Sequence, residues 1–394
     1  MSLPPVAFVV QRYGPSVTGG SETLARSVAE RLKDRFEVTV FTTCAADYVS
    51  WRNELPPGEE QEGGVRVRRF PVEEERDLAA FNAFAEPLYA RETTHEEEVE
   101  FLRRQGPCVP ALVEALAAEA DRYRAVVFFT YLYYPTYWGL RAAGERSVLV
   151  PTTHDEPPLR FSVYREVFAR PRAFGFLTPA EERLVRSRFA LGARAGLLVG
   201  MGIDTPAPPD VDGFRRRHGL ECPYALYAGR FDAGKGGSEL LAFHQRYRRQ
   251  HEDGAELVLI GKLAMTLGPS TPGVRHLGFL PEEEKAAAMA GASAVVCPSP
   301  YESLSIVLLE GFALGTPGLV NARSPVLQEH CLRSNAGLYY GDADEYAEAL
   351  DLLVRDRALR EALAAAGRRY VEAGYRWPVV LDRWHALVEA AARR

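Results

Sequence analysis

The sequence predicts an α/β protein with two similar halves, each built on a doubly wound parallel sheet covered by helices on both faces. Two observations predict this class. Short apolar segments rich in Val, Ile and Phe alternate with segments of helical period along most of the 394 residues, and such nearly continuous apolar strands are typical of parallel sheets. The alternation also restarts after the proline-rich segment Thr205–Asp210. We therefore expect one domain at residues 1–203 and a second at 204–376.

The first half begins with an apolar strand at Val6–Gln11, followed by a helix at Ser21–Lys33 with apolar side chains on one face. Residues 73–108 fit the alternation poorly, because they contain acidic runs at 73–75 and 96–98 that are typical of solvated helix faces. The other strands expected in this half are Val38–Thr43, Val65–Phe70, Val126–Thr130 and Val148–Thr153.

The second half repeats the pattern, with helices expected at Gly237–His251 and Leu304–Ala313. A last segment, Trp377–Arg394, has an apolar stripe of helical spacing, so we expect a terminal helix that packs either on its own half or on the first. The strands expected in this half are Tyr224–Gly229, Glu256–Gly261, Val274–Leu277, Ala294–Cys297 and Pro317–Val320.

The composition excludes several classes of protein. Hydrophobic residues make up 47% of the chain and charged residues 25%, which excludes a disordered or collagen-like protein. The 47 Lys and Arg residues stand against 53 Asp and Glu, and this net charge of −6 disfavours a nucleic-acid partner. The cysteines form no CxxC pair, so neither a zinc site nor a disulfide framework is expected, and a reducing compartment is favoured. They are Cys44, Cys108, Cys222, Cys297 and Cys331.

The sequence shows no signal for membrane insertion or export. The first five residues lack the charged and apolar regions of a signal peptide. No uncharged apolar run approaches the roughly 18 residues that span a bilayer. We therefore expect a cytoplasmic protein.

The first candidate binding loop is Gly14–Gly20, which leads directly into a helix. Ligands of doubly wound sheets bind beyond the carboxyl ends of the strands, and Gly19 and Gly20 allow backbone amides to approach an anion at the helix N-terminus. The loop is not GxGxxG, so the dinucleotide fingerprint is absent. An anion site and a plain loop are both open interpretations.

The strongest local signal is the loop Gly229–Gly236, where Arg230 and Lys235 place two cations between a strand and a helix. A planar guanidinium and a compact ammonium suit a diphosphate. The segment nearly matches the Walker pattern, but Gly236 stands where a hydroxyl residue would hold magnesium, and the next strand lacks the Asp that a nucleotide hydrolase uses on the metal. We expect a diphosphate site that is not a P-loop; the alternative is a structural role for both cations.

A third loop, Pro298–Ser305, continues into the helix that contains Glu310. Glu302 precedes this helix and Glu310 is expected two turns inside it, so a rise of about 1.5 Å per residue separates them by roughly 12 Å. Carboxylates accept hydrogen bonds from vicinal hydroxyls, which suits a sugar and a ribose at the two ends of a diphosphate. The amides of Ser303, Leu304 and Ser305 would face the phosphates. The alternative is a Glu near the helix cap and a second Glu that faces solvent.

A fourth loop, Thr152–Glu156, places His154 at the carboxyl end of a strand. A single histidine is more often a hydrogen-bonded structural residue, but this position favours a functional one. Asp155 beside it is either a partner of the imidazole or a loop cap.

Taken together, these stretches resemble the retaining GT-B glycosyltransferases of family 4, also called group 1, over nearly the whole chain. The most specific elements are Arg230 and Lys235 in a GRxxxxKG stretch and the E-x7-E motif of Glu302 and Glu310. The supporting elements are Gly19-Gly20, His154-Asp155, Gly202-Ile203-Asp204 and Gly278-Phe279-Leu280-Pro281.

The chain departs from the family pattern at two places. Met201 stands where Asn commonly precedes the Gly-x-Asp stretch. Lys262 and Leu263 follow Gly261 where the family often has an acidic residue and a glycine. This second loop lies near the nucleotide in the family, so no preference for a base is implied.

The resemblance implies two Rossmann-like domains facing across a cleft, with the terminal helix returning to the first domain. The donor would be a nucleoside diphosphate sugar bound mainly by the second domain, and neither a metal nor another cofactor is implied. Arg230 and Lys235 would neutralise the diphosphate, Glu302 would hold the donor sugar and Glu310 the ribose. His154 would lie near the reacting centre.

The mechanism implied is a same-face displacement. The acceptor hydroxyl would attack the anomeric carbon on the face from which the diphosphate departs, and a phosphate oxygen would take its proton. Catalysis would then consist mostly of electrostatic stabilisation of the leaving group.

The acceptor side is less defined. The aromatic stretch Tyr131–Trp138 is suited to stacking on a sugar or covering a lipid, but core packing is the favoured interpretation. The segment Arg160–Arg172 interleaves arginines with aromatic residues. Contact with anionic lipid head groups at the inner face of a membrane and an ordinary surface helix with extended arginines are both open. The acceptor is therefore expected to be a carbohydrate, a lipid-linked molecule or a metabolite.

Three other functions are weaker interpretations. A GT-B nucleotide-sugar epimerase would share the architecture but use no acceptor. A non-catalytic subunit that binds sugar nucleotide would tend to lose the cationic pair or a motif Glu, and this chain retains both. An NAD dehydrogenase is disfavoured because GxGxxG is absent.

Overall fold

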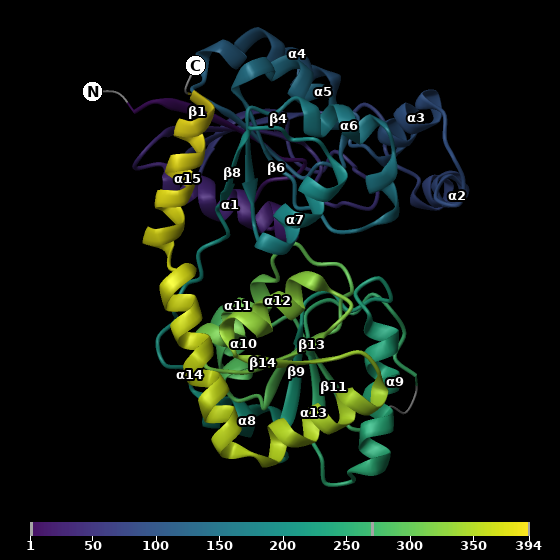
Figure 1. Cartoon of the computed structure of the whole chain (residues 1–394), viewed down its shortest axis with the longest axis vertical. Coiled ribbons are helices and arrows are strands. Elements are labelled where there is room, and N and C mark those ends of the chain that lie inside the picture. The colour runs from purple at the N-terminus through teal and green to yellow at the C-terminus, as the bar shows by residue number, and fades with distance from the viewer. Residues whose placement is uncertain (1–2, 269–271, 393–394) are drawn as a thin grey trace. The chain divides into compact units, whose positions relative to one another are not determined.

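The computed structural model describes residues 3–268 and 272–392 (Figure 1). The chain divides into two compact units: unit 1 is Met1–Met201 with Val380–Arg394, and unit 2 is Gly202–Val379. Each unit contains one predominantly parallel sheet with helices packed on it, which confirms the predicted α/β class.

Unit 1 contains an eight-stranded sheet with the order β3-β4-β2-β1-β5-β6-β7-β8. All neighbouring pairs are parallel except β3 and β4 at one edge. The strand order reverses between β1 and β5, and doubly wound sheets bind ligands at such a reversal. The strands are β1 (Pro5–Val9), β2 (Glu37–Thr43), β3 (Gly58–Glu62), β4 (Val65–Phe70), β5 (Val126–Phe129), β6 (Ser147–Val150), β7 (Ala173–Phe176) and β8 (Ala195–Leu198).

Helices cover both faces of this sheet. Successive side chains of a strand point to opposite faces: Ala7 and Val9 of β1 belong to a core shared with α2 to α6, whereas Phe8 packs 6.2 Å from the ring of Trp384 in α15. The helices of unit 1 are α1 (Gly20–Leu32), α2 (Leu78–Leu88), α3 (His95–Gln105), α4 (Pro110–Glu119), α5 (Tyr134–Ala143), α6 (Val163–Ala169), α7 (Pro179–Arg188) and most of α15 (Trp377–Ala392). Short 3₁₀ turns occur at Ala120–Arg122, Gly144–Arg146 and Pro157–Arg160.

The terminal helix α15 packs on unit 1 from Val380 onward. The ring of Trp384 is fully buried, stacks 5.8 Å from Phe129, and donates a hydrogen bond of 3.1 Å from Nε1 to the carbonyl of Gly200. An ion pair between Arg124 and Glu389 adds a surface contact. Of the two interpretations that the sequence left open for this helix, the structure shows packing against the first half.

Unit 2 contains a six-stranded, fully parallel sheet with the order β11-β10-β9-β12-β13-β14. The order reverses between β9 and β12, so the loops that follow these two strands flank the expected ligand position. The strands are β9 (Tyr224–Ala228), β10 (Glu256–Ile260), β11 (Val274–Gly278), β12 (Ala294–Cys297), β13 (Gly318–Asn321) and β14 (Gly337–Tyr340). The helices are α8 (Val211–His218), α9 (Gly237–Gln250), α10 (Glu282–Ala290), α11 (Ile306–Leu314), α12 (Pro325–Ser334), α13 (Ala343–Arg355) and α14 (Arg357–Gly374).

One acidic run differs from its expected role. The run at 96–98 lies in the first turn of α3, but Glu98 is only 2% exposed. Its carboxylate accepts hydrogen bonds from the hydroxyl of Thr93 at 2.6 Å and from the backbone N–H of Val163 at 2.9 Å. Glu98 therefore ties α3 to the start of α6, and the prediction of a solvated face is wrong at this residue.

Across the described part of the chain, no helix combines the length and apolar character needed to cross a membrane.

Candidate active site

The loop after β9 is held in shape by its own Asp232. The Oδ1 atom of Asp232 accepts a hydrogen bond of 2.8 Å from the backbone N–H of Lys235, and Oδ2 pairs with Nε of Arg230. The hydroxyl of Tyr227 donates to the carbonyl of Arg230 at 2.7 Å. These contacts hold the guanidinium of Arg230 and the backbone of Lys235 in place after β9. Asp232 was not among the predicted site residues, although its position between the two cations in the sequence was a usable signal.

Gly236 allows this loop to lie against the loop that follows β12. Its φ is +78°, and a Cβ atom there would approach the carbonyl oxygen of Pro298 to 2.5 Å. No side chain larger than hydrogen fits this contact without a shift of the backbone. The glycine that departs from the Walker pattern therefore has a packing role of its own.

An ion pair joins the two motifs that the sequence analysis singled out separately. The Nζ atom of Lys235 lies 2.9 Å from Oε1 of Glu302, and the side chains are 41% and 20% exposed. The two residues are 67 positions apart in the chain. They meet because β9 and β12 are adjacent and their following loops leave the same edge of the sheet.

Glu310 lies closer to the start of its helix than the sequence predicted. Helix α11 begins at Ile306, so Glu310 is one turn inside it, and Glu302–Ser305 is not helical. The separation of roughly 12 Å expected from helical rise therefore does not apply, because half of the interval is loop. Burial raises the pKa of Glu310, and Lys285 opposes this shift from 2.9 Å.

The segment of Ser303, Leu304 and Ser305 ends in a residue with a strained backbone. Ser305 precedes α11 with a φ of +65°, a region that non-glycine residues rarely adopt and that clusters at functional sites. Behind it, the buried His330 contacts the carbonyl of Leu304 at 2.9 Å and the hydroxyl of Tyr370 at 3.1 Å. Burial lowers the pKa of His330 to about 4, so the imidazole is neutral and can donate to one partner while accepting from the other. Nothing in the local sequence pointed to His330.

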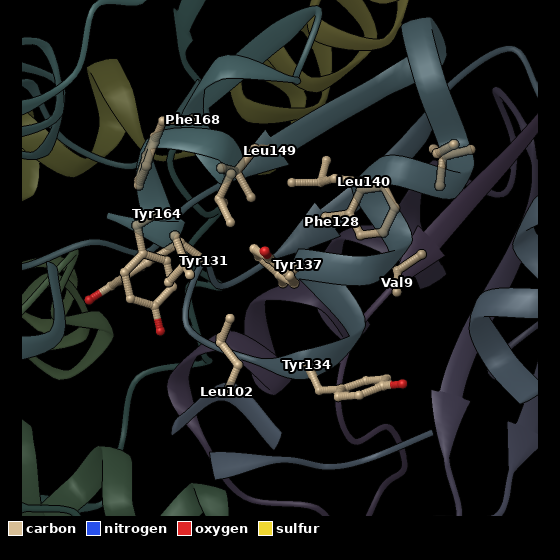
Figure 2. Close-up of a cluster of buried hydrophobic side chains, with 14 of the residues drawn as sticks. Val9, Leu102, Phe128, Tyr131, Tyr134, Tyr137, Leu140, Leu149, Tyr164 and Phe168 are labelled. Carbon is tan, nitrogen blue, oxygen red and sulfur yellow. The ribbon is translucent and has the colours of Figure 1, made fainter. Parts of the chain in front are cut away.

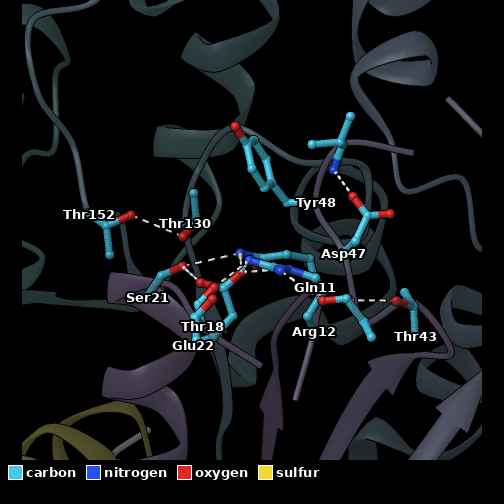
Figure 3. A network of polar contacts seen from close by, with 12 residues as sticks. Gln11, Arg12, Thr18, Ser21, Glu22, Thr43, Asp47, Tyr48, Thr130 and Thr152 are labelled. Carbon is cyan, nitrogen blue, oxygen red and sulfur yellow. Dashed lines mark hydrogen bonds and ion pairs between the residues drawn. The ribbon is translucent and has the colours of Figure 1, made fainter. Parts of the chain in front are cut away.

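In unit 1, the glycine loop is built around a buried ion pair (Figure 3). Arg12 donates to Oε1 of Glu22 from Nη2 at 2.6 Å and from Nε at 3.0 Å, and both side chains are only 6% exposed. The same guanidinium donates to the carbonyls of Thr18 at 3.1 Å and Ala46 at 2.9 Å. Arg12 thus connects the glycine loop, the first turn of α1 and the loop after β2.

The two predicted glycines have different surroundings. A Cβ on Gly19 would come within 2.2 Å of Oε2 of Glu22, so the buried pair excludes any side chain there. A Cβ on Gly20 would meet no atom within 4 Å. Gly20 is the first residue of α1, and the space beside it leaves the helix N-terminus approachable.

His154 lies just beyond β6, and its carboxylate neighbour is Glu156. The Nε2 atom of His154 is 3.3 Å from Oε2 of Glu156, while Oε1 of Glu156 accepts a hydrogen bond of 2.7 Å from the hydroxyl of the buried Tyr131. Asp155 instead forms an exposed ion pair with Arg188 at 3.1 Å. This ion pair is the contact of Asp155 that the structure shows, and the two roles considered for it, a partner of the imidazole and a loop cap, stay predictions.

Two further strained residues lie at this edge of unit 1. Thr130 follows β5 with a φ of +68° and Thr152 follows β6 with a φ of +50°. Their hydroxyls form a hydrogen bond of 3.0 Å (Figure 3). Positive φ at β-branched residues is costly, so the surrounding structure must enforce it, as is common at binding sites.

The aromatic stretch Tyr131–Trp138 packs into the core (Figure 2). Tyr131, Tyr134 and Tyr137 are all less than 10% exposed, and Tyr131 lies edge-on to Tyr164 with ring centroids 4.8 Å apart. In the same way, the aromatic residues of Arg160–Arg172 are buried and its arginines are exposed. Both segments follow the packing interpretation of the sequence.

Within residues 3–268 and 272–392, no group of three or more His, Cys, Asp or Glu residues is placed to hold a metal ion.

Comparisons with known proteins agree with this geometry. The family model of Glycosyl transferases group 1 matches residues 212–370. The chain is 31% identical over 268 residues to the GDP-mannose-dependent alpha-(1-6)-phosphatidylinositol monomannoside mannosyltransferase of Mycobacterium tuberculosis, covering 60% of this chain and 68% of the relative. It is 28% identical over 273 residues to the phosphatidyl-myo-inositol mannosyltransferase of Mycobacterium leprae, covering 65% and 70%.

Solved structures of the GT-B fold are similar over almost the entire chain. Sucrose-phosphate synthase from Thermosynechococcus elongatus superposes with a TM-score of 0.72 at 21% identity, covering 98% of both chains. The E. coli trehalose-6-phosphate synthase bound with UDP-2-fluoro glucose superposes with a TM-score of 0.69 at 14% identity, covering 99% of both. The chain therefore belongs to the group 1 glycosyltransferases of the GT-B fold, and it is a glycosyltransferase that uses a nucleotide-sugar donor.

Proposed function

We propose that this enzyme is a retaining glycosyltransferase that moves a sugar from a nucleoside diphosphate sugar to a hydroxyl group of a glycan, glycolipid or metabolite, without a metal ion. The observation that supports this most directly is the 2.9 Å ion pair between Lys235 and Glu302. It brings a cation suited to phosphate and a carboxylate suited to sugar hydroxyls to the strand reversal of unit 2.

Unit 2 is proposed to bind the donor. Arg230 and Lys235 neutralise the charge that develops on the departing diphosphate, Glu302 accepts hydrogen bonds from the donor sugar, and Glu310 accepts them from the ribose. The backbone of Ser303–Ser305 lies beside the phosphates. Each well-placed donor to a developing oxyanion contributes about 3–4 kcal/mol to catalysis, so this charge neutralisation is the main catalytic effect.

Unit 1 is proposed to bind the acceptor, with His154 as its residue for the reacting centre and with Gly19 and Gly20 leaving the N-terminus of α1 open to an anion. The acceptor oxygen forms a bond to the anomeric carbon as the bond from that carbon to the diphosphate breaks on the same face. The acceptor proton passes to a phosphate oxygen of the leaving group, so atoms and charges balance without a covalent enzyme intermediate.

Turnover of a panel of sugar nucleotides tests this proposal. GDP-mannose and UDP-glucose come first, because one relative is named as GDP-mannose-dependent and one neighbour was solved with a UDP-glucose analogue. Mass spectrometry with and without acceptor, and with and without chelator, detects nucleoside diphosphate release and isomerised sugar nucleotide. NMR of the product reports the anomeric configuration.

Matched variants identify the site. Lys235→Ala and Arg230→Ala are expected to lose at least about a hundredfold in kcat, whereas Arg357→Ala, which removes an arginine that is 82% exposed on α14, leaves kcat unchanged. Inverted product, dependence on added metal, or an isomerised donor without transfer would each contradict the corresponding part of the proposal.

The names of two relatives, both phosphatidylinositol mannosyltransferases, favour a lipid-linked acceptor. The exposed arginines of Arg160–Arg172 offer contacts to anionic head groups. Co-sedimentation with vesicles containing phosphatidylinositol, compared with phosphatidylcholine alone, tests this choice; equal recovery from both would favour a water-soluble acceptor.

A further inference from the structure

Lysine is rare in this chain and is concentrated at one edge of unit 2. Of the 47 basic residues, four are lysines: Lys33, Lys235, Lys262 and Lys285. The last three follow β9, β10 and β11 respectively, at the carboxyl edge of the sheet. Arginine supplies nearly every other positive charge, so lysine is used mainly where a compact charge on a flexible stem can reach a ligand.

The position of Lys285 is unfavourable for a cation in its own helix. Helix α10 begins at Glu282, and its first turn contains three glutamates, as expected where the positive end of the helix dipole favours negative charge. Lys285 immediately follows them. Besides Glu282 of its own helix, at 3.3 Å, Lys285 has a partner outside α10.

That partner is Glu310, to which the resemblance assigns the donor ribose. The Nζ atom of Lys285 lies 2.9 Å from Oε1 of Glu310, and the side chains are 23% and 25% exposed. A second carboxylate, Glu282, is 3.3 Å from the same Nζ and is 87% exposed. Lys285 therefore contacts Oε1 of Glu310, and Oε2 is the oxygen considered for a ligand.

The electrostatic surroundings of Glu310 depend on this lysine. The charged groups that face Glu310 are Lys285 and Glu282 from α10 and Asp204 from the segment that precedes α8. Burial, Glu282 and Asp204 all raise the pKa of Glu310, and Lys285 opposes them. Burial lowers the pKa of Lys285, but Glu310 and Glu282 raise it by more, so the pKa lies above its ordinary value and Lys285 remains charged.

We propose that Lys285 and Glu310 bind the donor ribose as a pair. Glu310 accepts a hydrogen bond from one ribose hydroxyl through Oε2, and the ammonium of Lys285 donates to the oxygen of the neighbouring hydroxyl. This inference rests on the proposed function and extends it: Lys285 becomes a specificity-determining residue that discriminates a ribonucleotide from a 2′-deoxyribonucleotide donor.

Calorimetric titration of the whole protein tests the pair. The ligands are UDP and GDP and the 2′-deoxy analogue of whichever binds. In the wild type the deoxy analogue is expected to bind about tenfold more weakly, which corresponds to about 1.4 kcal/mol. Lys285→Met should weaken the ribonucleotide about tenfold and bring the ratio between the two ligands close to one. Lys285→Arg should restore part of the discrimination, and the charge-matched Lys33→Met should leave both affinities unchanged.

The pH dependence supplies a second measurement. Without Lys285, Glu310 faces only carboxylates and is protonated more readily, so binding by Lys285→Met should weaken progressively as the pH falls from 8 to 5.5. The wild type should change less over this range. A purely structural ion pair between α10 and α11 would alter the melting temperature without altering the ratio of ribose to deoxyribose affinity.

The outcomes separate this inference from the proposed function. If the wild type binds neither UDP nor GDP, nor any other nucleoside diphosphate, the proposed function fails. If it binds one of them and Lys285→Met keeps the full deoxy discrimination, only the inference is overturned. If Lys285→Met does not fold, acetylation of the four lysines in the wild type decides: protection of Lys285 by nucleotide, with Lys33 unchanged, supports the pair, and protection of Lys235 alone refutes it.

Discussion

Gly236→Ala is the substitution whose effect the structure defines most closely. The φ of Gly236 is +78°, and the added Cβ would lie 2.5 Å from the carbonyl oxygen of Pro298, a backbone atom that cannot rotate away. A left-handed conformation costs a non-glycine residue about 1–2 kcal/mol, and overpacking of this kind costs about 1–3 kcal/mol. The reduced entropy of the unfolded chain returns about 0.4–1 kcal/mol. The expected net loss is about 1–5 kcal/mol in the free energy of unfolding.

The same substitution should affect donor binding. Relief of the contact moves the loop after β9 away from the loop after β12, which lengthens the 2.9 Å ion pair between Lys235 and Glu302. We therefore expect nucleoside diphosphate affinity to fall about tenfold or more, in addition to the loss of stability.

Gly234→Ala is the matched control, since it places the same methyl group in the same loop. Gly234 has no left-handed φ, and the nearest atom to its added Cβ is the side-chain Oδ1 of Asp232 at 3.3 Å. Its free energy of unfolding should change by less than about 1 kcal/mol. Urea unfolding followed by circular dichroism, with nucleotide titration of both variants, makes the comparison. Equal unfolding midpoints and equal affinities for the two variants would show that the contact with Pro298 does not constrain the loop.

Three further predictions concern residues to which the sequence analysis assigned no role. Glu156→Gln removes the carboxylate beside His154, so turnover should fall about tenfold to a hundredfold, the loss of one charge-assisted hydrogen bond; unchanged turnover would exclude a positioning role. Glu22→Ala leaves Arg12 buried without its partner and should cost about 3–5 kcal/mol in urea unfolding, whereas a loss below about 1 kcal/mol would mean that water reaches the guanidinium. Burial lowers the pKa of His330 to about 4 from 6.5, so between pH 6.5 and 4 the unfolded chain binds more protons than the folded protein. The free energy of unfolding should therefore fall as the pH drops from 6.5 to 4. The fall should be smaller in His330→Gln, and an equal fall in both proteins would show that His330 is not its source.

The sequence analysis did not predict β7, β8 and β14, but the other apolar strands were predictable because each is a short run bounded by a turn. The edge strand β3 was not, since its sequence, Gly58–Glu62, contains no apolar side chain and three of its five residues are glutamates. It pairs antiparallel with β4, and its glutamates form ion pairs with Arg66 and Arg69 of that strand. Such a strand is specified by its neighbour and not by its own hydrophobicity, so periodicity alone cannot detect it.

The candidate site also contains residues that were predictable from the sequence and residues that were not. Residues that would contact the donor, such as Lys235 and Glu302, stand in glycine- or serine-rich loops at strand ends, where the sequence itself shows an unusual local pattern. Residues that hold those loops are harder to predict: His330 belongs to a segment with an ordinary sequence, and Glu156 stands in a loop where His154 and Asp155 were singled out instead. Their roles arise from contacts at a distance, 26 residues between His330 and Leu304 and 25 between Glu156 and Tyr131. Only the fold brings such partners together.

The ion pairs of unit 2 also suggest how donor binding and sugar recognition are coupled. In the structure each cation of the proposed donor site has a carboxylate partner, with Arg230 beside Asp232 and Lys235 beside Glu302. A diphosphate that attracts Lys235 competes with Glu302 for it, and the released carboxylate oxygen can then accept a hydroxyl of the donor sugar. A nucleoside diphosphate without sugar gains the first contact but leaves Glu302 partly unpaired, which is costly in a half-buried position. In a double-mutant cycle, the losses of binding free energy for the intact sugar nucleotide should therefore be non-additive when Lys235→Ala and Glu302→Gln are combined. Strictly additive losses would show that the two residues act independently.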